Sequence, residues 1–505
     1  MAIYSCLQDC LSNPTNIVLL VLVCIIIYGV LSLRIPSGFP SGPRGYPFIG
    51  NMLALAKEPH ITLTNYAKTY GDVYTIKLGN TPVVILNSIE VIKETLVKKQ
   101  NDYAGRPNVY SFEMLSEGGE DIVMADFTPK WKVLRKFVHQ AMRNYANGEK
   151  LESLIRDVSF PRLQQAINEK NGQPFHPKPA ILLMIANIMA TMCFGQRYEL
   201  NDKEFLGYLK FINDLNEAFG NGLVADFIPF FRYIPTTGRT KVEALYKAYL
   251  QTIQCKIDEH KLKFENGNRE ARDLIDDLLI AQEKALKAGE ADAALIGDVN
   301  LRQTVADVFG AGLDTTVTTL DWCVAYLCCY PDVQTKVQTE IDQAIGHDRL
   351  PLLSDKAILP YCEAVIHEVT RIRTVAPFAV PHTTTIDTSV GEYKLPKYTW
   401  VWMNLWNVHM NEKHWKKPEE FRPERFLDAD GNLVPKPENV LPFSTGRRVC
   451  VGEALAKNEM FLIFVSLFQN YTFKVPPGKD KPCLKDHCEG LAIRCCPYNV
   501  LAVSR

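Results

Sequence analysis

The sequence has no disulfide framework and no excess of either charge. Its 14 cysteines are scattered through 505 residues without regular spacing, which excludes a disulfide-rich secreted scaffold and favours a reducing compartment. The formal net charge is -1, so no global basic field indicates nucleic-acid binding. The composition is otherwise that of an ordinary globular protein, and charge has to be interpreted locally.

The cysteine positions also lack the spacing of a structural zinc site. The nearest pattern combines Cys483, His487 and Cys488 with Cys495 and Cys496, and it matches no zinc template. Small buried thiols are the favoured interpretation, because free cysteine is among the most buried residue types. A zinc-bound cysteine protein is the third option for the chain as a whole, behind this interpretation.

The first 33 residues contain no Lys or Arg, and residues 10–33 carry no charge of either sign. Residues 17–33 are almost wholly apolar, and with neutral neighbours a helix of this length nearly spans a hydrocarbon layer of about 30 Å. A cleaved signal peptide would need a basic region and a small-residue cleavage site, so an uncleaved anchor is favoured. Arg34 and Arg44 follow the span and predict that the rest of the chain is cytoplasmic.

Three segments are expected: an anchor over residues 1–33, a hinge over 34–51 and a catalytic body over 52–505. The prolines and glycines of the hinge favour extended and turn geometry. A hairpin is predicted around Gly79-Asn80, and mostly helical periodicity follows it. Strand-like sequence returns at 379–405, 470–475 and 490–503. With no repeat and no second linker visible, the sequence predicts one large, mainly α domain with a minor β part.

The longest predicted helix has an unusual centre. It starts at Asp298, a suitable N-cap, and runs for about thirty residues to a proline. Gly310 and Gly312 each cost about 1 kcal/mol relative to alanine in a helix interior, and four β-branched threonines follow closely. An acid and an alcohol beside a local opening can hold water and move protons, which makes Asp314 and Thr315 candidate catalytic residues. The alternative is a close contact with another helix that the glycines permit.

One cysteine lies in a setting suited to a metal. Cys450 follows Arg447 and Arg448 in a glycine-rich loop, and the helix-like stretch EALAKNEMFLIF begins just after it. A helix amino terminus and nearby cations lower the pKa of a thiol, and the thiolate is a soft ligand for iron or copper. Gly446 and Gly452 allow a sharp turn and a close approach of the backbone.

The residues Phe443, Gly446, Arg448, Cys450 and Gly452 match F-x-x-G-x-R-x-C-x-G, and the chain thereby resembles the cytochrome P450 family of haem-thiolate monooxygenases. The rest of the family pattern is present as E-x-x-R in EVTR, the arginine of FRPERF, A-G-x-D-T-T in AGLDTT and W-x-x-x-R in WKVLR. The resemblance covers essentially the whole chain. It implies the fold of that family, haem b as cofactor and dioxygen as oxidant.

The resemblance implies a role for each matching residue. Cys450 corresponds to the axial ligand of the haem iron, and Phe443 to the residue packed beside its sulfur. Asp314 and Thr315 correspond to the acid-alcohol pair that relays protons to dioxygen. The matching haem-propionate partners are Trp131, Arg135, His382 and Arg448, and the matching structural cluster is Glu368, Arg371 and Arg425. For the lone histidine, an ordinary core position is the alternative.

Electrons have to come from a partner, because no flavin or nicotinamide fingerprint is visible. The resemblance implies an NADPH-cytochrome reductase, with a cytochrome b-type donor as a second candidate, at the endoplasmic reticulum membrane. Family members that rearrange peroxides without a reductase commonly lack the threonine, which this chain keeps. A cationic docking face is predicted from Lys130, Lys132, Lys136, Arg143 and Arg447. A solvated charged surface without a partner is the alternative.

Local strings such as FGAGLDTTVTT and ADFIPFFRYIP resemble the branch that holds aryl-hydrocarbon monooxygenases and steroid 17-alpha-monooxygenases. The substrate is therefore expected to be planar and hydrophobic: a polycyclic aromatic, a xenobiotic or a steroid. The pocket residues expected by analogy are Asn216, Phe219, Ala311, Ala376, Phe378, Val380 and Leu491. Ordinary core packing is the alternative for each aromatic residue. The runner-up function is a dedicated steroid 17-alpha-hydroxylase/17,20-lyase, and a haem-binding sensor or carrier without turnover is the alternative from a different class.

Overall fold

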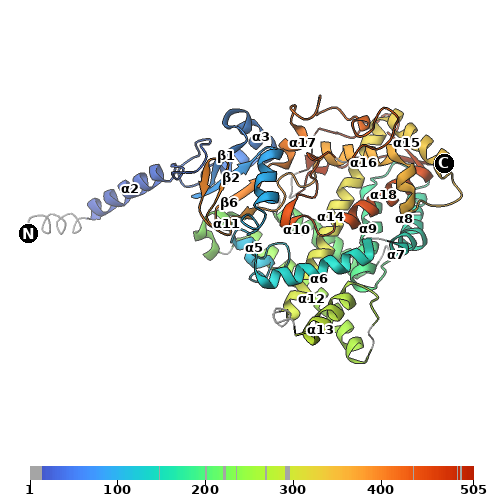
Figure 1. Cartoon of the computed structure of the whole chain (residues 1–505), viewed down its shortest axis with the longest axis horizontal. Helices are drawn as coiled ribbons and strands as arrows, with labels where there is room; N and C mark the ends of the chain where they lie inside the picture. Colours follow the sequence, from blue (N-terminus) through green and yellow to red (C-terminus); the bar gives the residue numbers. More distant parts are fainter. Residues whose placement is uncertain are drawn as a thin grey trace, which may run out of the picture.

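The computed structural model describes residues 14–505, except for 147, 200–201, 220–222, 235, 268–269, 290–295, 436, 486 and 489–491. One helix projects from a body in which many helices surround a long central helix, with the largest sheet on the side of the projecting helix (Figure 1). The predicted fold class, mainly α with a minor β part, is confirmed.

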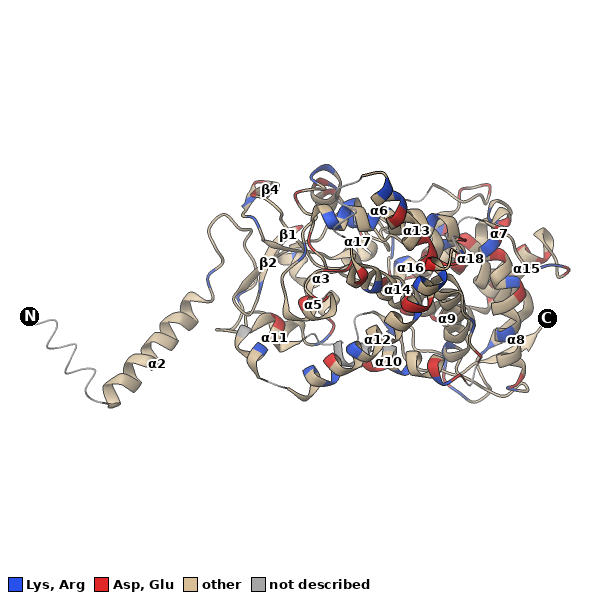
Figure 2. Ribbon diagram, turned by 90° about the horizontal axis from the view of Figure 1, so that it is seen from below, with Lys and Arg blue, Asp and Glu red and all other residues tan. Residues whose placement is uncertain are grey.

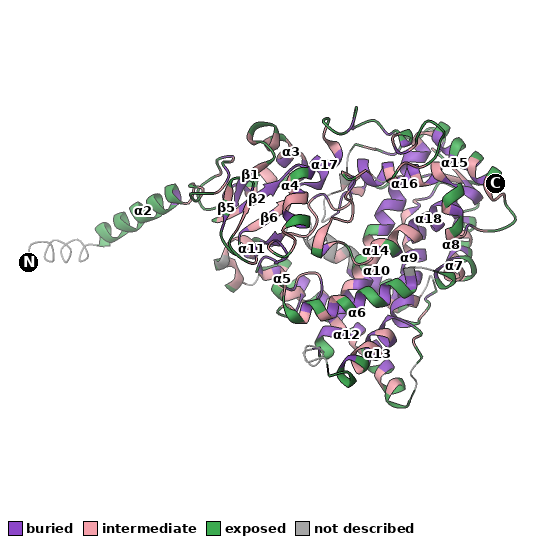
Figure 3. Cartoon of the chain, in the orientation of Figure 1, coloured by how far each residue is buried: buried purple, intermediate pink, exposed green. Residues whose placement is uncertain are grey.

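The apolar amino-terminal stretch forms α2 (Pro14–Leu31), which stands away from the body with almost every side chain exposed (Figure 3). Within the described residues it is the one helix whose length and composition suit a membrane span. The hinge that follows packs onto the sheet from Gly42, where an added Cβ would lie 1.8 Å from the carbonyl oxygen of Thr75. This close approach ties the base of α2 to the body.

The predicted hairpin is confirmed as β1 (Val73–Leu78) and β2 (Thr81–Leu86), paired antiparallel. On its other edge β2 pairs in parallel with β6 (Trp400–Met403), and β6 pairs antiparallel with β3 (His382–Thr383). Among the described residues, three two-stranded sheets complete the β part. They are β4 (Thr388–Val390) with β5 (Tyr393–Leu395), β7 (Tyr471–Lys474) with β10 (Leu501–Ser504), and β8 (His487–Cys488) with β9 (Arg494–Cys495).

The helices follow the periodicity of the sequence. Before the central helix come α3 (Pro59–Tyr70), α4 (Ile89–Ile92), α5 (Tyr110–Leu115), α6 (Pro129–Ala146), α7 (Glu149–Leu154), α8 (Phe160–Asn168), α9 (Lys178–Phe194), α10 (Lys203–Phe219), α11 (Val224–Phe227), α12 (Thr237–Glu265) and α13 (Leu274–Lys287). After it come α15 (Pro331–Ala344), α16 (Pro360–Ile372), α17 (Leu405–Met410) and α18 (Glu453–Asn470). Single turns of π-helix, η2 (Lys93–Lys98) and η3 (Ile155–Ser159), extend α4 and α7. Short 3-10 turns are η1 (Met52–Leu55), η4 (Pro229–Tyr233), η6 (Leu353–Ile358), η7 (Pro423–Phe426) and η8 (Gly446–Arg448).

The central helix α14 (Asp298–Cys329) has 32 residues, as the sequence predicts. Its expected N-cap is wrong by one position, because Gly297 occupies the cap and its amide donates to the side chain of Asn300 at 2.9 Å. Asp298 instead forms an ion pair with Lys261. α14 packs against α9, α12, α16 and α18, so it lies in the hydrophobic core for most of its length.

Candidate functional site

Exposed side chains occur at the centre of the body, on elements that are otherwise buried. Ala311 and Thr315 of α14 are exposed and Asp314 is partly exposed, although most of this helix is buried. Cys450, three residues before α18, is also exposed, although burial by surrounding protein raises the pKa of its thiol. The helix that follows Cys450, α18, packs against α14, so the two elements that carry or flank these exposed positions are neighbours.

The loop that carries Cys450 has a backbone that depends on glycine. Gly446 has a φ of 79°, and an added Cβ would lie 1.9 Å from a carbonyl oxygen of η2. The amide of Cys450 donates to the carbonyl of Phe443 at 3.0 Å and closes the turn. Burial raises the pKa of the thiol, whereas a hydrogen bond from the amide of Gly452 and the charge of Arg135 lower it. The last two groups favour a thiolate at this position.

Arg448 is buried and keeps one unused group of donors. Its Nε and Nη2 donate to the carbonyls of Ala104 and Ala125, each at 2.8 Å. Its guanidinium lies 4.0 Å from the ring centroid of Trp131, and Nη1 is buried without a hydrogen-bond partner among the described residues. A buried cationic donor without an acceptor is costly. This position therefore suits an anionic group that the described chain does not supply.

A second buried arginine, which the sequence interpretation missed, adds to this positive charge. Burial, opposed by Asp121, lowers the pKa of Arg106 to about 9, and Arg135 contributes to the lowering. Burial, together with the charges of Arg106 and Arg135, lowers the pKa of Arg448 to about 8. These three cations repel one another in a weakly polarisable interior, so negative charge in their midst would be strongly favoured. The one sequence feature that distinguishes Arg106 is the proline that follows it, and this feature does not indicate a buried cation.

The other predicted propionate partners lie in the same group. In two of them, Trp131 and His382, the ring N–H already donates to a backbone carbonyl. The indole N–H of Trp131 donates to a backbone carbonyl at 3.0 Å. Burial, then the charge of Arg106, lowers the pKa of His382 well below its usual range, and its Nδ1 donates to a carbonyl at 2.6 Å. The neutral ring therefore presents Nε2 as an acceptor. Arg135 donates to the carbonyl of the residue before Cys450 and retains further guanidinium donors.

The predicted structural cluster is assembled and fully buried at its centre. Arg371 donates through Nε and Nη2 to the two oxygens of Glu368 at 2.7 and 2.8 Å, and Arg425 donates to the same carboxylate at 3.2 Å. The remaining donors of Arg371 reach the carbonyls of His409 and Pro418, each at 2.8 Å. Buried charges that are this completely paired join α16 to the segment around η7.

The acid and the alcohol of α14 both have partners. Oδ2 of Asp314 accepts from Nη2 of Arg494 at 2.7 Å, which links α14 to β9. The hydroxyl of Thr315 donates to the carbonyl of Ala311 at 2.9 Å, within its own helix. The sequence interpretation missed Arg494, because an isolated arginine in the two-residue strand β9 belongs to no recognisable motif.

The two glycines of α14 have different neighbours. A Cβ on Gly312 would lie 2.4 Å from Cε of Met189 on α9, so the close helix contact considered as the alternative is present there. A Cβ on Gly310 would find its nearest neighbour, the hydroxyl of Tyr249, at 3.6 Å. The close contact therefore explains Gly312 and leaves Gly310 without a steric reason.

The predicted substrate pocket is only partly within the described residues. Ala311 is exposed, while Ala376, Phe378 and Val380 are partly exposed. The ring of Phe378 also lies 5.8 Å from that of Trp402 and packs against the sheet. The side chains of Asn216 and Phe219, in the last turns of α10, and all of Leu491 lie outside the described residues.

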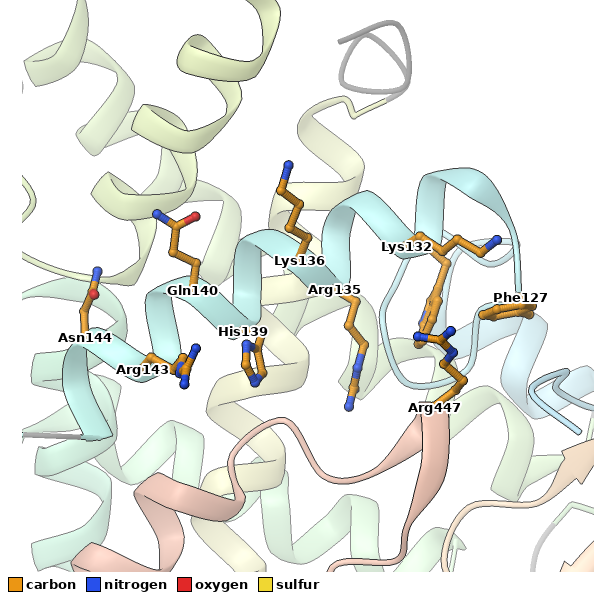
Figure 4. Close-up of a pocket in the computed structure, with 10 residues that line it drawn as sticks. Phe127, Lys132, Arg135, Lys136, His139, Gln140, Arg143, Asn144 and Arg447 are labelled. Atoms are coloured by element: carbon orange, nitrogen blue, oxygen red, sulfur yellow. The ribbon is translucent and has the colours of Figure 1, made fainter. Parts of the chain in front are cut away.

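A basic depression of about 690 Å³ lies on the outer surface of α6 (Figure 4). Four of the five predicted docking residues line it: Lys132, Lys136, Arg143 and Arg447. Lys130 does not, and its Nζ lies 2.5 Å from Oε2 of Glu120. Lys and Arg recur along this helix (Figure 2). Because Arg135 lines the same depression and bonds to the Cys450 loop, the depression lies directly outside that loop.

Comparison with known proteins identifies this combination of features. The family model described as Cytochrome P450 matches residues 40–501. The chain belongs to the cytochrome P450 family. Cytochrome P450 1A5 of Gallus gallus is 37% identical over 460 residues, covering 88% of this chain and 86% of that protein. The steroid 17-alpha-hydroxylase/17,20 lyase of Rana dybowskii is 38% identical over 478 residues, covering 93% and 90%.

Solved structures give the same family. A zebra fish cytochrome P450 with progesterone superimposes with a TM-score of 0.78 and 31% identity, over 88% of this chain and 99% of that one. The structure with abiraterone gives 0.77 and 32% over the same shares. The protein is thus a haem-thiolate monooxygenase that uses haem b, dioxygen and electrons from a redox partner, and that binds hydrophobic substrates.

The residues present fit haem. Its iron takes a thiolate ligand, and Cys450 is an accessible sulfur that a backbone amide and a cation surround. Its two carboxylates need cationic donors, and the buried Nη1 of Arg448 lacks an acceptor among the described residues while Arg106 and Arg135 add positive charge. Asp121 and Asp126 offset only part of this buried positive charge, since the pKa values of Arg106 and Arg448 are still lowered, and an anionic cofactor explains the rest.

Proposed function

We propose that this chain is a membrane-anchored monooxygenase that inserts one atom of dioxygen into a planar hydrophobic compound, either aromatic, xenobiotic or steroidal. The pair Asp314 and Thr315, accessible at the centre of α14, carries this proposal. A haem sensor or carrier without turnover has no need for a proton-transfer pair beside its cofactor. Catalysis is therefore favoured over the sensor alternative.

The haem, when bound, supplies the iron at which dioxygen is activated. The chain positions it and handles the protons. Cys450 offers the thiolate, and Arg448 is placed to donate through Nη1 to a carboxylate. The hydroxyl of Thr315 donates a hydrogen bond to the carbonyl of Ala311, and the carboxylate of Asp314 accepts one from Arg494. Transfer of a proton through this pair therefore requires at least one of these two bonds to open.

Replacement of the proposed ligand tests the thiolate assignment. Cys450→His should abolish the shifted carbon monoxide spectrum of the reduced protein, because that shift depends on an anionic sulfur ligand. Cys255→Ser is the matched control, since Cys255 is exposed on α12 and contributes nothing to the site. A shifted spectrum that survives in Cys450→His would exclude this cysteine as the ligand.

The substrate class is supported by the relatives. The bird and frog proteins differ by one percentage point in identity to this chain, and one of them is named a steroid hydroxylase and lyase. The zebra fish structures carry progesterone and abiraterone. The second candidate function, a dedicated steroid 17-alpha-hydroxylase/17,20-lyase, rests on the frog relative, which covers 93% of this chain.

A binding screen by difference spectroscopy separates the two candidates. Pregnane steroids and polycyclic aromatics of similar size are titrated into the haem-loaded protein, and the water-displacing shift of the Soret band is recorded. Saturable shifts from pregnanes alone, followed by 17-hydroxylated product with reductase and NADPH, favour the dedicated steroid enzyme. Saturable shifts from aromatics alone exclude it. If neither class binds, the planar-substrate proposal is wrong.

The electron supply and location complete the proposal. The basic depression of α6 suits an acidic flavoprotein, so an NADPH-cytochrome reductase is the proposed donor and a cytochrome b-type protein a second one. The exposed apolar helix α2 supports single-pass anchoring in the endoplasmic reticulum membrane with a cytoplasmic body. The anchor would be excluded if alkaline carbonate released the full chain from membranes as completely as a chain without residues 1–33.

A further inference from the structure

Cysteines that the haem chemistry does not use gather near the carboxyl end of α14. Cys328 and Cys329 are the last residues of this helix, and β9, which contains Cys495, packs against it. Within this group Cys495 is buried, whereas Cys488 and Cys496 are partly exposed. The sequence pattern, interpreted as small buried thiols, therefore divides into inaccessible and accessible members.

The two partly exposed thiols meet across the hairpin of β8 and β9. Sγ of Cys488 lies 3.7 Å from Sγ of Cys496. Cys488 is paired with Arg494, so Cys496, two residues further along, faces the same side of the hairpin. A disulfide holds its sulfurs about 2.0 Å apart, and rotation about the side-chain bonds supplies most of the remaining approach. Cys496 lies beyond the end of β9, so its backbone can adjust without breaking a ladder hydrogen bond.

We propose that Cys488 and Cys496 form a reversible disulfide with hydrogen peroxide as the oxidant. One thiolate attacks the peroxide, forming an S–O bond while the O–O bond breaks and water leaves after protonation. The second thiol then attacks the resulting sulfenic acid, forming the S–S bond while the S–O bond breaks and a second water leaves. Two thiols and one peroxide thus give one disulfide and two waters.

The neighbouring thiols compete poorly for the oxidant. The reactive species is the thiolate, and burial raises the pKa of Cys328 to about 12 and that of Cys329 to about 11. Burial also raises the pKa of Cys495. Two electrons and two protons convert dioxygen to hydrogen peroxide, so the proposed monooxygenase activity, on which this step rests, supplies the oxidant whenever those electrons do not reach substrate. The accessible pair therefore has a source of its oxidant in the same protein.

The disulfide would act on a strand that is already fastened to the catalytic helix. The amide of Ile493 donates to the carbonyl of Val375, and the indole of Trp322 donates to the carbonyl of Ile493, each at 2.9 Å. The next residue, Arg494, holds Asp314 at 2.7 Å. A cross-link between β8 and this segment restrains the strand that carries the partner of Asp314.

Peptide mapping of the full-length protein tests the proposal. The reduced protein is treated with one to five equivalents of hydrogen peroxide, its remaining thiols are alkylated, and the digest is analysed by mass spectrometry. A linked peptide pair containing Cys488 and Cys496, which dithiothreitol restores to two thiols, is the expected result. Cys488→Ser and Cys496→Ser should each abolish it. Cys483→Ser, a substitution of an exposed thiol in the same segment, should leave it unchanged.

Three outcomes would overturn the proposal. The first is a wild-type protein in which both thiols remain alkylatable at peroxide levels that oxidise exposed Cys255. The second is a bridge from Cys488 or Cys496 to a different cysteine or to a second chain. The third is protection of both thiols by added zinc, combined with no bridge in its absence, which would indicate a soft-metal site instead.

Discussion

Arg494 is the residue whose role is most specific to the arrangement around α14. Its ion pair holds the carboxylate of Asp314, so under the proposed function it positions that carboxylate for proton transfer. Arg494→Gln should lower kcat about tenfold with little change in KM, less than the ~100-fold that loss of a positioned proton donor costs. The fraction of NADPH electrons recovered as hydrogen peroxide should rise, because dioxygen that has taken up two electrons and two protons is released as hydrogen peroxide when further proton delivery is slow.

The conservative variant Arg494→Lys controls for a purely structural effect. It keeps a cation opposite Asp314 and should recover most of the lost kcat and coupling, with a pH profile like that of the wild type. If kcat and coupling fall equally in both variants, and thermal stability falls in both as well, Arg494 has only a structural role.

Glu459 on α18 makes a different kind of residue-scale prediction. It is buried, its Oε1 lacks a hydrogen-bond partner among the described residues, and burial raises its pKa to about 8. The folded state therefore keeps a proton that the unfolded chain releases above pH of about 4.5, and stability falls as pH rises from there to 8. The loss amounts to a few kcal/mol, since each pKa unit is worth about 1.4 kcal/mol.

Glu459→Gln should remove this slope. Unfolding midpoints are measured at pH 5.5, 6.5, 7.5 and 8.5. The stability of the variant relative to the wild type should increase as pH rises, even if the amide lowers stability by a constant amount at every pH. Glu453→Gln is the control, because Glu453 lies partly exposed on the same helix beside Lys457. A difference between Glu459→Gln and wild type that does not change with pH would contradict the raised pKa.

At the scale of elements, the contact between α14 and α9 predicts opposite signs for two neighbouring substitutions. Gly310→Ala should stabilise the fold by up to about 1 kcal/mol through helix propensity, because its nearest neighbour is 3.6 Å from the added Cβ. Gly312→Ala should destabilise it by about 1–3 kcal/mol, because the side chain of Met189 must move. Urea unfolding of each variant measures both effects.

A double-mutant cycle attributes the effect of Gly312 to this contact. Met189→Ala alone leaves a cavity and should cost about 2–5 kcal/mol. Combined with Gly312→Ala it should cost clearly less than the sum of the two single variants, because the added methyl group occupies space that the methionine has left. Strict additivity would show that the two helices do not meet through these side chains.

At the scale of the whole molecule, the basic depression of α6 predicts how the body meets its electron donor. Lys132→Glu with Arg143→Glu should raise the KM for the reductase about tenfold at low salt. The difference should shrink towards 1 M salt, where the Debye length is about 3 Å. Both the KM for the reductase and its salt dependence are obtained from the rate of haem reduction at increasing reductase concentration. Lys474→Glu, an exposed site on β7, is the control, and an equal loss there would exclude docking at the depression.

Local chemistry determined much of the protein from the sequence alone. The uncharged run that forms α2, the turn at Gly79-Asn80 and the period of the long helix α14 each depend on neighbours in the chain. The thiolate loop is also a local motif, since ten consecutive residues carry its glycines, arginine and cysteine. These features predicted the fold class, the cofactor and the ligand.

Tertiary structure decided what long-range packing controls. Arg106 joins the cations around Arg448 from more than three hundred residues away, and Arg494 reaches Asp314 across 180 residues. The contact at Gly312 and the buried Oε1 of Glu459, which has no partner among the described residues, likewise depend on which helices meet. Spacing in the chain does not encode such encounters, because they follow from the burial of many side chains at once. For that reason the sequence determined the chemistry, and only the folded structure decided which residues position it.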